Sequence, residues 1–313
     1  MEAAGGWLNP QTPSLFARFA AHVVSALGDL CDLWATINEP VIYATQSFLL
    51  GEFPPGTTNI RQTLRVVKQM LVGHGAAASA IRRVNSNARI GLVHHVRLFD
   101  PATPAPADVA VAAVWDYLFN ALVLQALRTG RLLPPLGLGL RVNKALRVSS
   151  DFVGLNYYTR ERVAFDRGAP GLLFGRRYTP PNVEQSDVGR AGTTYGEIYP
   201  AGLRRALRRV GSLGLPVYVT EAGLPDADDD QRPSFLVRHL AAVHDALQDG
   251  VDVRGFFHWT LVDNFEWAEG WGLRFGLYAL DQHTQQRTLR PSGALYAAIA
   301  RANALPGPSY SAG

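Results

Sequence analysis

The chain of 313 residues contains one cysteine, Cys31, and only two lysines, Lys68 and Lys144. A single cysteine can neither close an internal disulfide nor by itself form a metal site. It indicates a small buried residue in a reducing compartment, so we expect a cytoplasmic protein. The net charge of +4 is carried almost entirely by arginine. The arginines are scattered and no nucleic-acid-binding motif accompanies them, so nucleic acid is not an expected partner.

The sequence also lacks long hydrophobic runs. No apolar run reaches the roughly 18 residues of a membrane span, so we expect no contact with a membrane. The first seven residues have neither the basic nor the apolar region of a signal peptide. With 47% hydrophobic and 18% charged residues, the composition excludes disordered, collagen-like and coiled-coil chains. No linker divides the chain, so we expect one domain, 1–313, with a frayed tail at about 304–313.

Short apolar strands alternate with helices along the chain. The strands are expected at residues 33–37, 89–96, 152–158, 217–220 and 253–259, and the main helices at 13–28, 60–84, 108–129, 200–213, 233–248 and 291–302. This alternation predicts parallel β/α architecture, and apolar strands suit burial on both faces. Asn59 is expected to cap the second helix. Residues 160–194 show no periodicity, and we expect a long functional loop there.

Polar residues follow the C-terminal ends of four of these strands, which is the edge where barrel enzymes build their active sites. Each set taken alone could be a hydrogen-bonded loop carboxylate or a packed core aromatic with no role in catalysis. Together they suggest two carboxylates across one pocket, as glycoside hydrolysis requires. Tryptophans would supply stacking faces for a sugar ring. The four sets are Asn38-Glu39-Pro40, Asn156-Tyr157-Tyr158, Thr220-Glu221-Ala222-Gly223, and His258-Trp259 with Asp263-Asn264-Phe265-Glu266-Trp267.

Three other clusters have simpler interpretations. The aspartates at 226 and 228–230 lack the calcium-loop pattern, so a solvated acidic loop is expected. The arginines at 204, 205, 208 and 209 share one side of a helix and are expected to be a solvated face. His94 and His95 end a strand at the presumed site, where a packed or hydrogen-bonded histidine is favoured over one that lines the aglycone region.

The motifs resemble glycoside hydrolase family 1, the β-glucosidase family, from about Gly5 to about Ala302. Beyond the four sets above, the matching stretches are Gly5-Gly6-Trp7-Leu8-Asn9, Asp151-Phe152-Val153-Gly154-Leu155 and Arg274-Phe275-Gly276-Leu277-Tyr278. The resemblance implies a retaining double displacement, with Glu39 as general acid/base and Glu221 as nucleophile. No cofactor and no metal ion are implied. The substrate would be a β-glycoside or an oligosaccharide.

The resemblance also implies roles for residues around the two carboxylates. Asn38 would bind the sugar 2-hydroxyl, and Tyr158 would orient Glu221. Trp259 would lie under the sugar, while Glu266, helped by Trp267, would bind the distal hydroxyls. Asn156 and Phe275 are also counted among the residues of the sugar site. Ala222 stands where the family usually has Asn, a position with no chemical role of its own.

The larger departure concerns the number of strands. The family fold is an eight-stranded barrel, and five strands are expected here. The resemblance therefore implies an incomplete, N-terminally truncated TIM (β/α)8-type barrel with about five of eight strands, barrel strands 4 to 8. The strands bearing Glu39 and Trp259 would be open edges, which invite self-association or a complementing fragment.

Three functional hypotheses stay open. The first is a β-glycosidase. The second is a weak or inactive family remnant that binds carbohydrate or acts as a scaffold. The third is a different barrel glycanase, which would not explain the stretch from Asp263 to Trp267.

Overall fold

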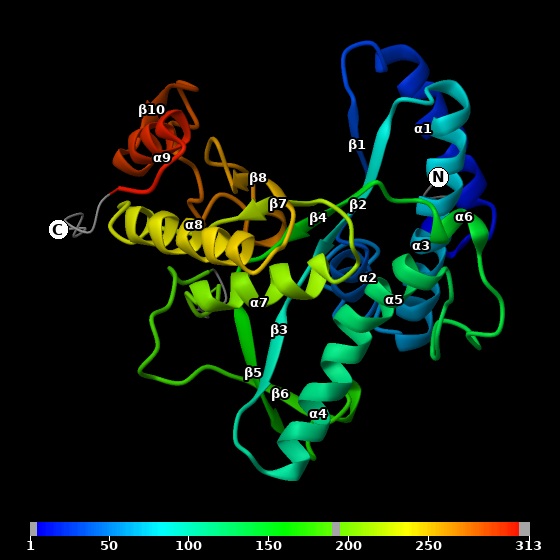
Figure 1. Cartoon of the computed structure of the whole chain (residues 1–313). Coiled ribbons are helices and arrows are strands. Elements are labelled where there is room, and N and C mark those ends of the chain that lie inside the picture. Colours follow the sequence, from blue (N-terminus) through cyan, green and yellow to red (C-terminus); the bar gives the residue numbers. More distant parts are fainter. Residues whose placement is uncertain (1–4, 190–194, 307–313) are drawn as a thin grey trace. The chain divides into compact units, whose positions relative to one another are not determined.

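The computed structural model describes residues 5–189 and 195–306. The last residues of the expected long loop, 190–194, and most of the expected frayed tail, 307–313, lie outside the described residues. The chain divides into two compact units (Figure 1). Unit 1 comprises Met1–Val96, Tyr117–Asn156 and Val210–Tyr218, and unit 2 comprises Arg97–Asp116, Tyr157–Arg209 and Val219–Gly313. The expected single domain 1–313 stays a prediction.

The expected parallel α/β sheet is present. Its hydrogen-bonded order is β1-β2-β4-β7-β8, with bounds Leu33–Asn38, Arg89–His95, Phe152–Asn156, Val217–Ala222 and Val253–His258. All five strands agree with the sequence-based expectation to within two residues. β2 and β4 are almost wholly buried, as expected of strands covered on both faces. β1 and β8 are only partly buried, and Phe257 on β8 is 56% exposed.

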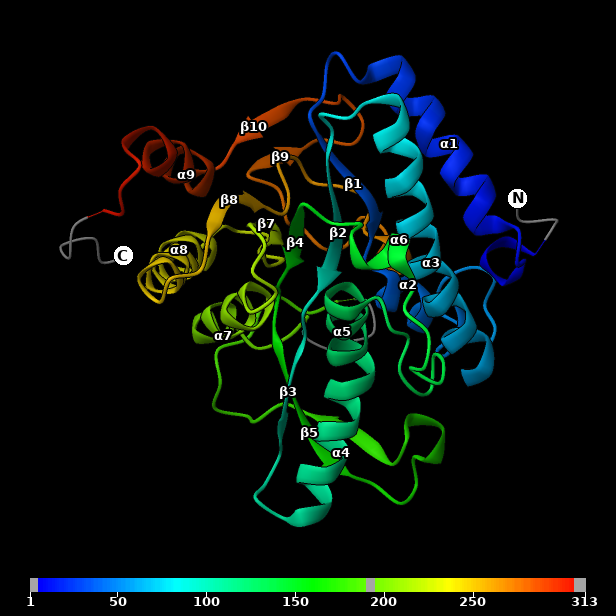
Figure 2. The same cartoon turned by 45° about the vertical axis from the view of Figure 1, so that its right-hand side comes forward.

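The helices of unit 1 cover its strands. They are α1, α2, α3, α5 and α6, with bounds Thr12–Leu27, Pro40–Phe48, Ile60–Val84, Leu122–Thr129 and Lys144–Arg147; η2 (Gly6–Leu8) precedes α1 and the π-turn η3 (Tyr117–Ala121) precedes α5. α1 and α3 run side by side in both views (Figures 1 and 2), where Val24 packs with Ala77 and Ile81. Asn59 caps α3 as predicted, because its side chain accepts the backbone N–H groups of residues 61 and 62.

The register of the strands in unit 1 aligns their C-terminal ends. β2 and β4 pair in parallel with His95 opposite Asn156. β1 pairs with β2, and its register shifts between Ala35 and Asn38. Such irregularities bend a strand and re-aim its side chains, often beside active sites. In β2, a glycine is required at 91 because a Cβ there would lie 2.4 Å from the Phe152 ring.

Unit 2 contains two smaller sheets besides its share of the main one. The first has the order β3-β5-β6 (Leu98–Pro101, Arg160–Phe165 and Gly175–Tyr178), and the second pairs β9 (Tyr278–Leu280) with β10 (Arg287–Leu289). The expectation of a loop over 160–194 is therefore wrong for β5, β6 and the short helix η4 (Pro170–Leu172). These strands escaped detection because β6 is largely exposed and rich in arginine, so it has no apolar alternation.

The helices of unit 2 are α4, α7, α8 and α9, with bounds Pro106–Asp116, Pro200–Gly211, Arg232–Gln248 and Pro291–Ala302; η5 (Trp267–Glu269) is a single 3-10 turn. α4, η3 and α5 form a continuous helical stretch, Pro106–Thr129. Of the described residues, this is the one helix long and apolar enough to cross a membrane by length and composition. Helices of soluble proteins pass the same test, so this is weak evidence for a membrane span.

Cys31 differs from its expected state. It is half-buried rather than buried, and its thiol donates to the carbonyl oxygen of Leu33 at 3.1 Å.

Candidate functional site

The predicted acid/base, Glu39, lies in unit 1 where β1 ends and α2 begins. Its backbone N–H donates to the Val93 carbonyl at 2.9 Å. Its φ of 47° and ψ of 59° place it in the left-handed region, which costs a residue other than glycine about 1–2 kcal/mol. Pro40 follows as the first residue of α2, a position that suits its fixed φ and missing N–H. Strain of this kind persists only where the surroundings impose it, and it concentrates at functional sites.

Two neighbouring strands contribute side chains that contact the Glu39 carboxyl group. Asn156 on β4 donates its amide N–H to Glu39 Oε1 at 2.8 Å and to Asn38 Oδ1 at 3.1 Å. His95 on β2 places Nδ1 3.0 Å from the same Oε1. Asn156 is fully buried, so it contacts the Glu39 carboxyl group and Asn38 from the protein interior. The structure thus brings three predicted site residues together and adds His95, which sequence analysis had left as a packed or hydrogen-bonded histidine.

A second histidine supports β1 from α3. His74 is fully buried, with Nδ1 2.7 Å from Thr36 Oγ1 on β1 and Nε2 3.0 Å from Ser150 Oγ. Burial, reinforced by the positive charge of Arg82, lowers the pKa of His74 to about 3. The imidazole is therefore neutral, and it links α3 to β1 two residues before Asn38.

The predicted nucleophile, Glu221, lies in unit 2 within β7. The hydroxyl of Tyr158 donates to Glu221 Oε2 at 2.6 Å, a short bond of the kind that an ionised acceptor strengthens. The Glu221 backbone carbonyl accepts the N–H of Tyr157 at 2.9 Å. Two residues after Glu221, a Cβ at Gly223 would lie 1.9 Å from the Trp259 carbonyl oxygen, so only glycine fits. Tyr158 thus contacts the carboxylate that it was predicted to orient; that role stays a prediction.

Aromatic side chains pack around Tyr158. The buried Phe275 lies edge-on to Tyr158 and to Tyr195, with ring centroids 6.4 and 5.2 Å apart respectively. Trp259 is partly buried and packs against the same cluster. Phe275 was predicted to contact substrate, but its side chain is fully buried and packs against the Tyr158 ring. Tyr195 was not predicted, because it follows the irregular stretch that showed no periodicity.

The stretch from Asp263 to Trp267 divides into a structural part and a surface part. Asp263 is 4% exposed and accepts bonds from Gly276 N and the Arg290 guanidinium, so it anchors the loop. Glu266 is largely buried, and its Oε2 accepts the Asn264 amide at 2.9 Å. Trp267 is 64% exposed and has a positive φ of 44°. The predicted role of Trp267 in binding the distal sugar hydroxyls stays a prediction.

The aspartates before α8 fit the expected solvated loop only in part, because Asp228 and Asp230 are exposed whereas Asp226 and Asp229 are buried. Asp226 is fully buried, and its Oδ2 accepts the backbone N–H groups of Gln231 and Arg232 where α8 begins. Arg232 is itself fully buried and pairs with Asp229. Burial raises the pKa of Asp226. Carboxylate oxygens of Asp226, Asp228 and Asp230 lie within 4.8 Å of one another, but the contacts of the buried members tie the loop to the helix and indicate a structural role.

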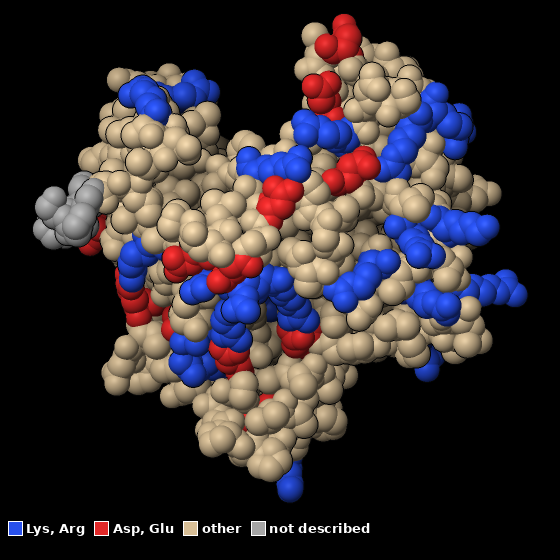
Figure 3. All heavy atoms as spheres, in the orientation of Figure 1, with Lys and Arg blue, Asp and Glu red and all other residues tan. Residues whose placement is uncertain are grey.

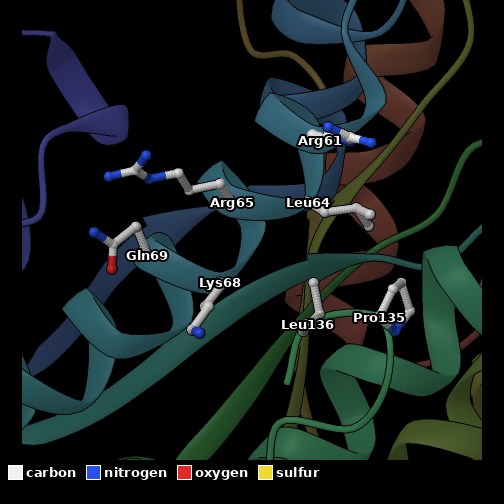
Figure 4. A pocket seen from close by; sticks show the side chains of 7 residues that line it. All are labelled: Arg61, Leu64, Arg65, Lys68, Gln69, Pro135 and Leu136. Atoms are coloured by element: carbon white, nitrogen blue, oxygen red, sulfur yellow. The ribbon is translucent and has the colours of Figure 1, made fainter. Parts of the chain in front are cut away.

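Two surface hollows contain none of the predicted site residues. One, of about 420 Å³ in unit 1, lies beside α3; its basic side chains point apart rather than toward a common centre, Arg61 to one side and Arg65 to the other (Figure 4). It is lined by Arg61, Leu64, Arg65, Lys68, Gln69, Pro135 and Leu136.

The other hollow, of about 470 Å³ in unit 2, lies over α7 and is lined by Ala201, Arg204, Arg205 and Arg208. Its arginines were expected to form a solvated face. Arg205 and Arg208 are exposed as expected, with side chains 47% and 66% exposed. Arg204 and Arg205 also form bidentate ion pairs with Asp249 and Asp100. Blue and red side chains accordingly alternate over this helix (Figure 3). These pairs leave no concentrated positive charge for an anion.

Comparison with known proteins places these residues in a family context. The model of glycosyl hydrolase family 1 matches residues 1–132 and 138–305. A β-galactosidase of Sulfolobus acidocaldarius is 34% identical over 96% of this chain and 61% of its own length. A β-glucosidase of Agrobacterium is 33% identical over 95% of this chain and 68% of its own length. A family 1 β-glucosidase structure from Thermotoga maritima has a TM-score of 0.86 at 30% identity, covering 97% of this chain and 71% of that one.

A further Thermotoga maritima structure, also with a TM-score of 0.86 and 30% identity, holds deoxynojirimycin; it covers 97% of this chain and 72% of that one. The chain thus spans about 60% of the length of several of the curated relatives it matches. The five-stranded parallel sheet corresponds to part of the (β/α)8 barrel of the structural neighbours.

Proposed function

Because the chain belongs to glycosyl hydrolase family 1, we propose that it is a β-glycosidase that cleaves β-glycosides with retention of configuration. The observation that carries the proposal is that each predicted carboxylate has its own built polar environment. Glu39 Oε1 accepts the Asn156 amide beside His95, and Glu221 Oε2 accepts the Tyr158 hydroxyl.

The proposed reaction has two displacements. In the first, Glu221 attacks the anomeric carbon while Glu39 protonates the glycosidic oxygen, so the alcohol leaves and a glycosyl ester forms on Glu221. In the second, Glu39 takes a proton from water, the oxygen of that water attacks the anomeric carbon, and the Glu221 carboxylate leaves. The Tyr158 hydroxyl holds the Glu221 carboxylate in place before attack and again as it departs.

The substrate proposed is a β-glucoside or β-galactoside. Relatives bear the names β-glucosidase and β-galactosidase, and a structural neighbour holds the sugar-like deoxynojirimycin. Trp259 and the exposed Trp267 supply aromatic faces for a pyranose. Asn38 and Glu266 supply hydrogen-bonding groups, which we assign to the sugar hydroxyls. No cofactor or metal enters these steps, and we propose that the protein works in the cytoplasm.

A second candidate, a weakly active or inactive carbohydrate-binding protein, is favoured by one observation. β1 and β8 are only partly buried, with Leu33 and Phe257 37% and 56% exposed. Exposed strands of this kind pair readily with other strands. Activity would then depend on self-association or on a complementing fragment at these strands, and a lone chain would bind sugar without turning it over.

The test is hydrolysis of 4-nitrophenyl β-glucoside and β-galactoside by the purified chain. Glu221→Ala should abolish turnover. The matched control, Glu52→Ala, changes an exposed glutamate and should leave turnover unchanged. Proton NMR of the first-formed sugar should show the β-anomer, because two inversions retain configuration. Turnover that survives in Glu221→Ala would refute the proposal, and a folded chain that binds sugar without turnover would favour the second candidate.

A further inference from the structure

Both described contacts of the Glu39 side chain converge on one of its two oxygens. Asn156 Nδ2 and His95 Nδ1 lie 2.8 and 3.0 Å from Oε1. A carboxylate oxygen presents about two lone-pair sites. The Asn156 amide occupies one of those on Oε1, and we assign the other to His95 in the tautomer that carries its proton on Nδ1. An oxygen that accepts N–H groups behaves as the carbonyl oxygen of the carboxylic acid, because these bonds disfavour a proton on it. The acid proton then belongs on Oε2.

We propose that His95 is a positioning residue for Glu39: its Nδ1–H and the Asn156 amide hold Oε1, so that the proton given to the leaving group is carried by Oε2. The proposal rests on the proposed function, since it assigns the acid/base role to Glu39. His95 touches neither substrate nor reacting atoms in this scheme. It acts by fixing the orientation of the carboxyl group.

His95 is suited to this role because its ring is immobile. It is 3% exposed, and the Phe119 ring lies edge-on to it with ring centroids 5.9 Å apart. The register of β2 against β4 places His95 directly opposite Asn156. Asn156 shares its amide between Glu39 and Asn38, so its bond alone would let the carboxyl group rotate about that contact. A second donor from the neighbouring strand removes this freedom.

The loss of activity on replacing His95 should depend on the leaving group of the substrate. A poor leaving group such as phenol needs protonation, whereas 2,4-dinitrophenol leaves as an anion. General acid catalysis contributes roughly 100- to 10,000-fold, and a misplacement of about 1 Å costs about 100-fold. We therefore expect His95→Leu to lower kcat/KM for a phenyl β-glycoside about 10- to 100-fold. For the 2,4-dinitrophenyl β-glycoside, kcat/KM should stay within about threefold of wild type.

His95→Asn is the rescuing variant, because an asparagine amide nitrogen can occupy the position of imidazole Nδ1. It should restore phenyl glycoside hydrolysis to within about threefold of wild type, since it keeps the hydrogen bond. His95→Gln places its amide at the position of Nε2 instead and should behave like His95→Leu; it also serves if the leucine variant fails to fold. Equal slowing of both substrates in the leucine and glutamine variants, or no rescue by asparagine, would overturn the proposal.

A second measurement needs no turnover. Carbon-13 NMR of δ-labelled glutamate, with the Glu39 signal assigned by its loss in Glu39→Gln, reports the titration midpoint of this carboxyl group. Donation to a carboxylate favours its ionised form, so His95→Leu should raise the midpoint and His95→Asn should not. An unchanged midpoint in His95→Leu overturns the positioning role. A wild-type chain that hydrolyses neither substrate refutes the proposed function, while this titration still decides the role of His95.

Other titratable side chains lie on the elements that pack around Glu39. Among them are Tyr43 on α2, His94 on β2 and His74 on α3, and α3 also carries five cationic side chains, Arg61, Arg65, Lys68, Arg82 and Arg83. His74 stays neutral over the range of the titration, because burial lowers its pKa to about 3. Tyr43→Phe is the control for the tyrosine, and it should leave the Glu39 midpoint where it is in the wild-type chain.

Discussion

Acidification should destabilise this protein through three buried histidines, and His239 on α8 offers the cleanest test. Its ring stacks on Phe235 with centroids 3.7 Å apart, and Nδ1–H donates to the Phe235 carbonyl at 2.8 Å. Nε2 is buried and has no acceptor among the described residues. Burial is the main reason that the pKa of His239 is lowered from 6.5 to about 3, and the charge of Arg238 adds to the effect. Burial likewise lowers the pKa of His74 and His258 to about 3.

The direction in which the free energy of unfolding changes with pH follows from proton binding. Between pH 6.5 and 3 the unfolded chain binds a proton on His239 that the folded chain does not, so the free energy of unfolding falls as the pH falls. At about 1.36 kcal/mol per pH unit, His239 contributes a loss of about 2 kcal/mol at pH 5. Three such histidines together lose about 6 kcal/mol, which is comparable with the whole stability of many domains. The aspartates with lowered pKa, such as Asp100 and Asp249, do not contribute between pH 7 and pH 5, because their usual pKa of 3.8 keeps them ionised in the unfolded chain as well; the stability they add is lost only at lower pH.

The assay is urea unfolding of wild type, His239→Met and His244→Gln at pH 7 and pH 5. His244 lies on the same helix with an exposed side chain, so its variant is the matched control. Whatever the stability of His239→Met at pH 7, its loss on going to pH 5 should be about 2 kcal/mol smaller than that of wild type. His244→Gln should lose as much as wild type. Equal losses in wild type and His239→Met would show that His239 is not held neutral by burial, and the reasoning would fail.

Three further predictions concern single contacts. Tyr158→Phe removes the 2.6 Å bond to Glu221, the proposed nucleophile, and should lower kcat for an aryl β-glycoside by about 10- to 100-fold, since bonds to charged groups contribute about 1.5–3 kcal/mol; an unchanged kcat would contradict the proposed role of Tyr158. Asn59→Ala removes the cap of α3 and should cost about 1 kcal/mol in urea unfolding, so a loss near zero would contradict the capping assignment. Gly223→Ala places a Cβ 1.9 Å from the Trp259 carbonyl oxygen, whereas the Cβ of the control variant Gly171→Ala meets nothing within 4 Å. Circular dichroism melts should show a large loss of Tm for Gly223→Ala and not for Gly171→Ala.

The sequence predicts the elements whose signals are local and periodic. The apolar strands and the long helix behind the Asn59 cap could be found in this way, whereas the Tyr158–Glu221 pair was implied by the family resemblance alone. β5 and β6 could not, because a small, exposed, arginine-containing sheet has no apolar alternation to detect. The contact of His95 with Glu39 depends on the register of β1 and β4 against β2. Register is a property of paired strands, which no single segment of sequence reveals.

Two glutamates of identical chemistry are distinguished here by where the backbone places them. Glu221 lies within β7, where the strand fixes its backbone and a tyrosine hydroxyl holds Oε2. A nucleophile must approach one carbon along one line, and a strand interior supports such a fixed position. Glu39 lies at a strand-to-helix junction, one residue beyond the end of β1, in a left-handed conformation. In the proposed reaction its carboxyl group gives and takes a proton, and we assign the orientation of that group to the side chains of β2 and β4 that contact Oε1.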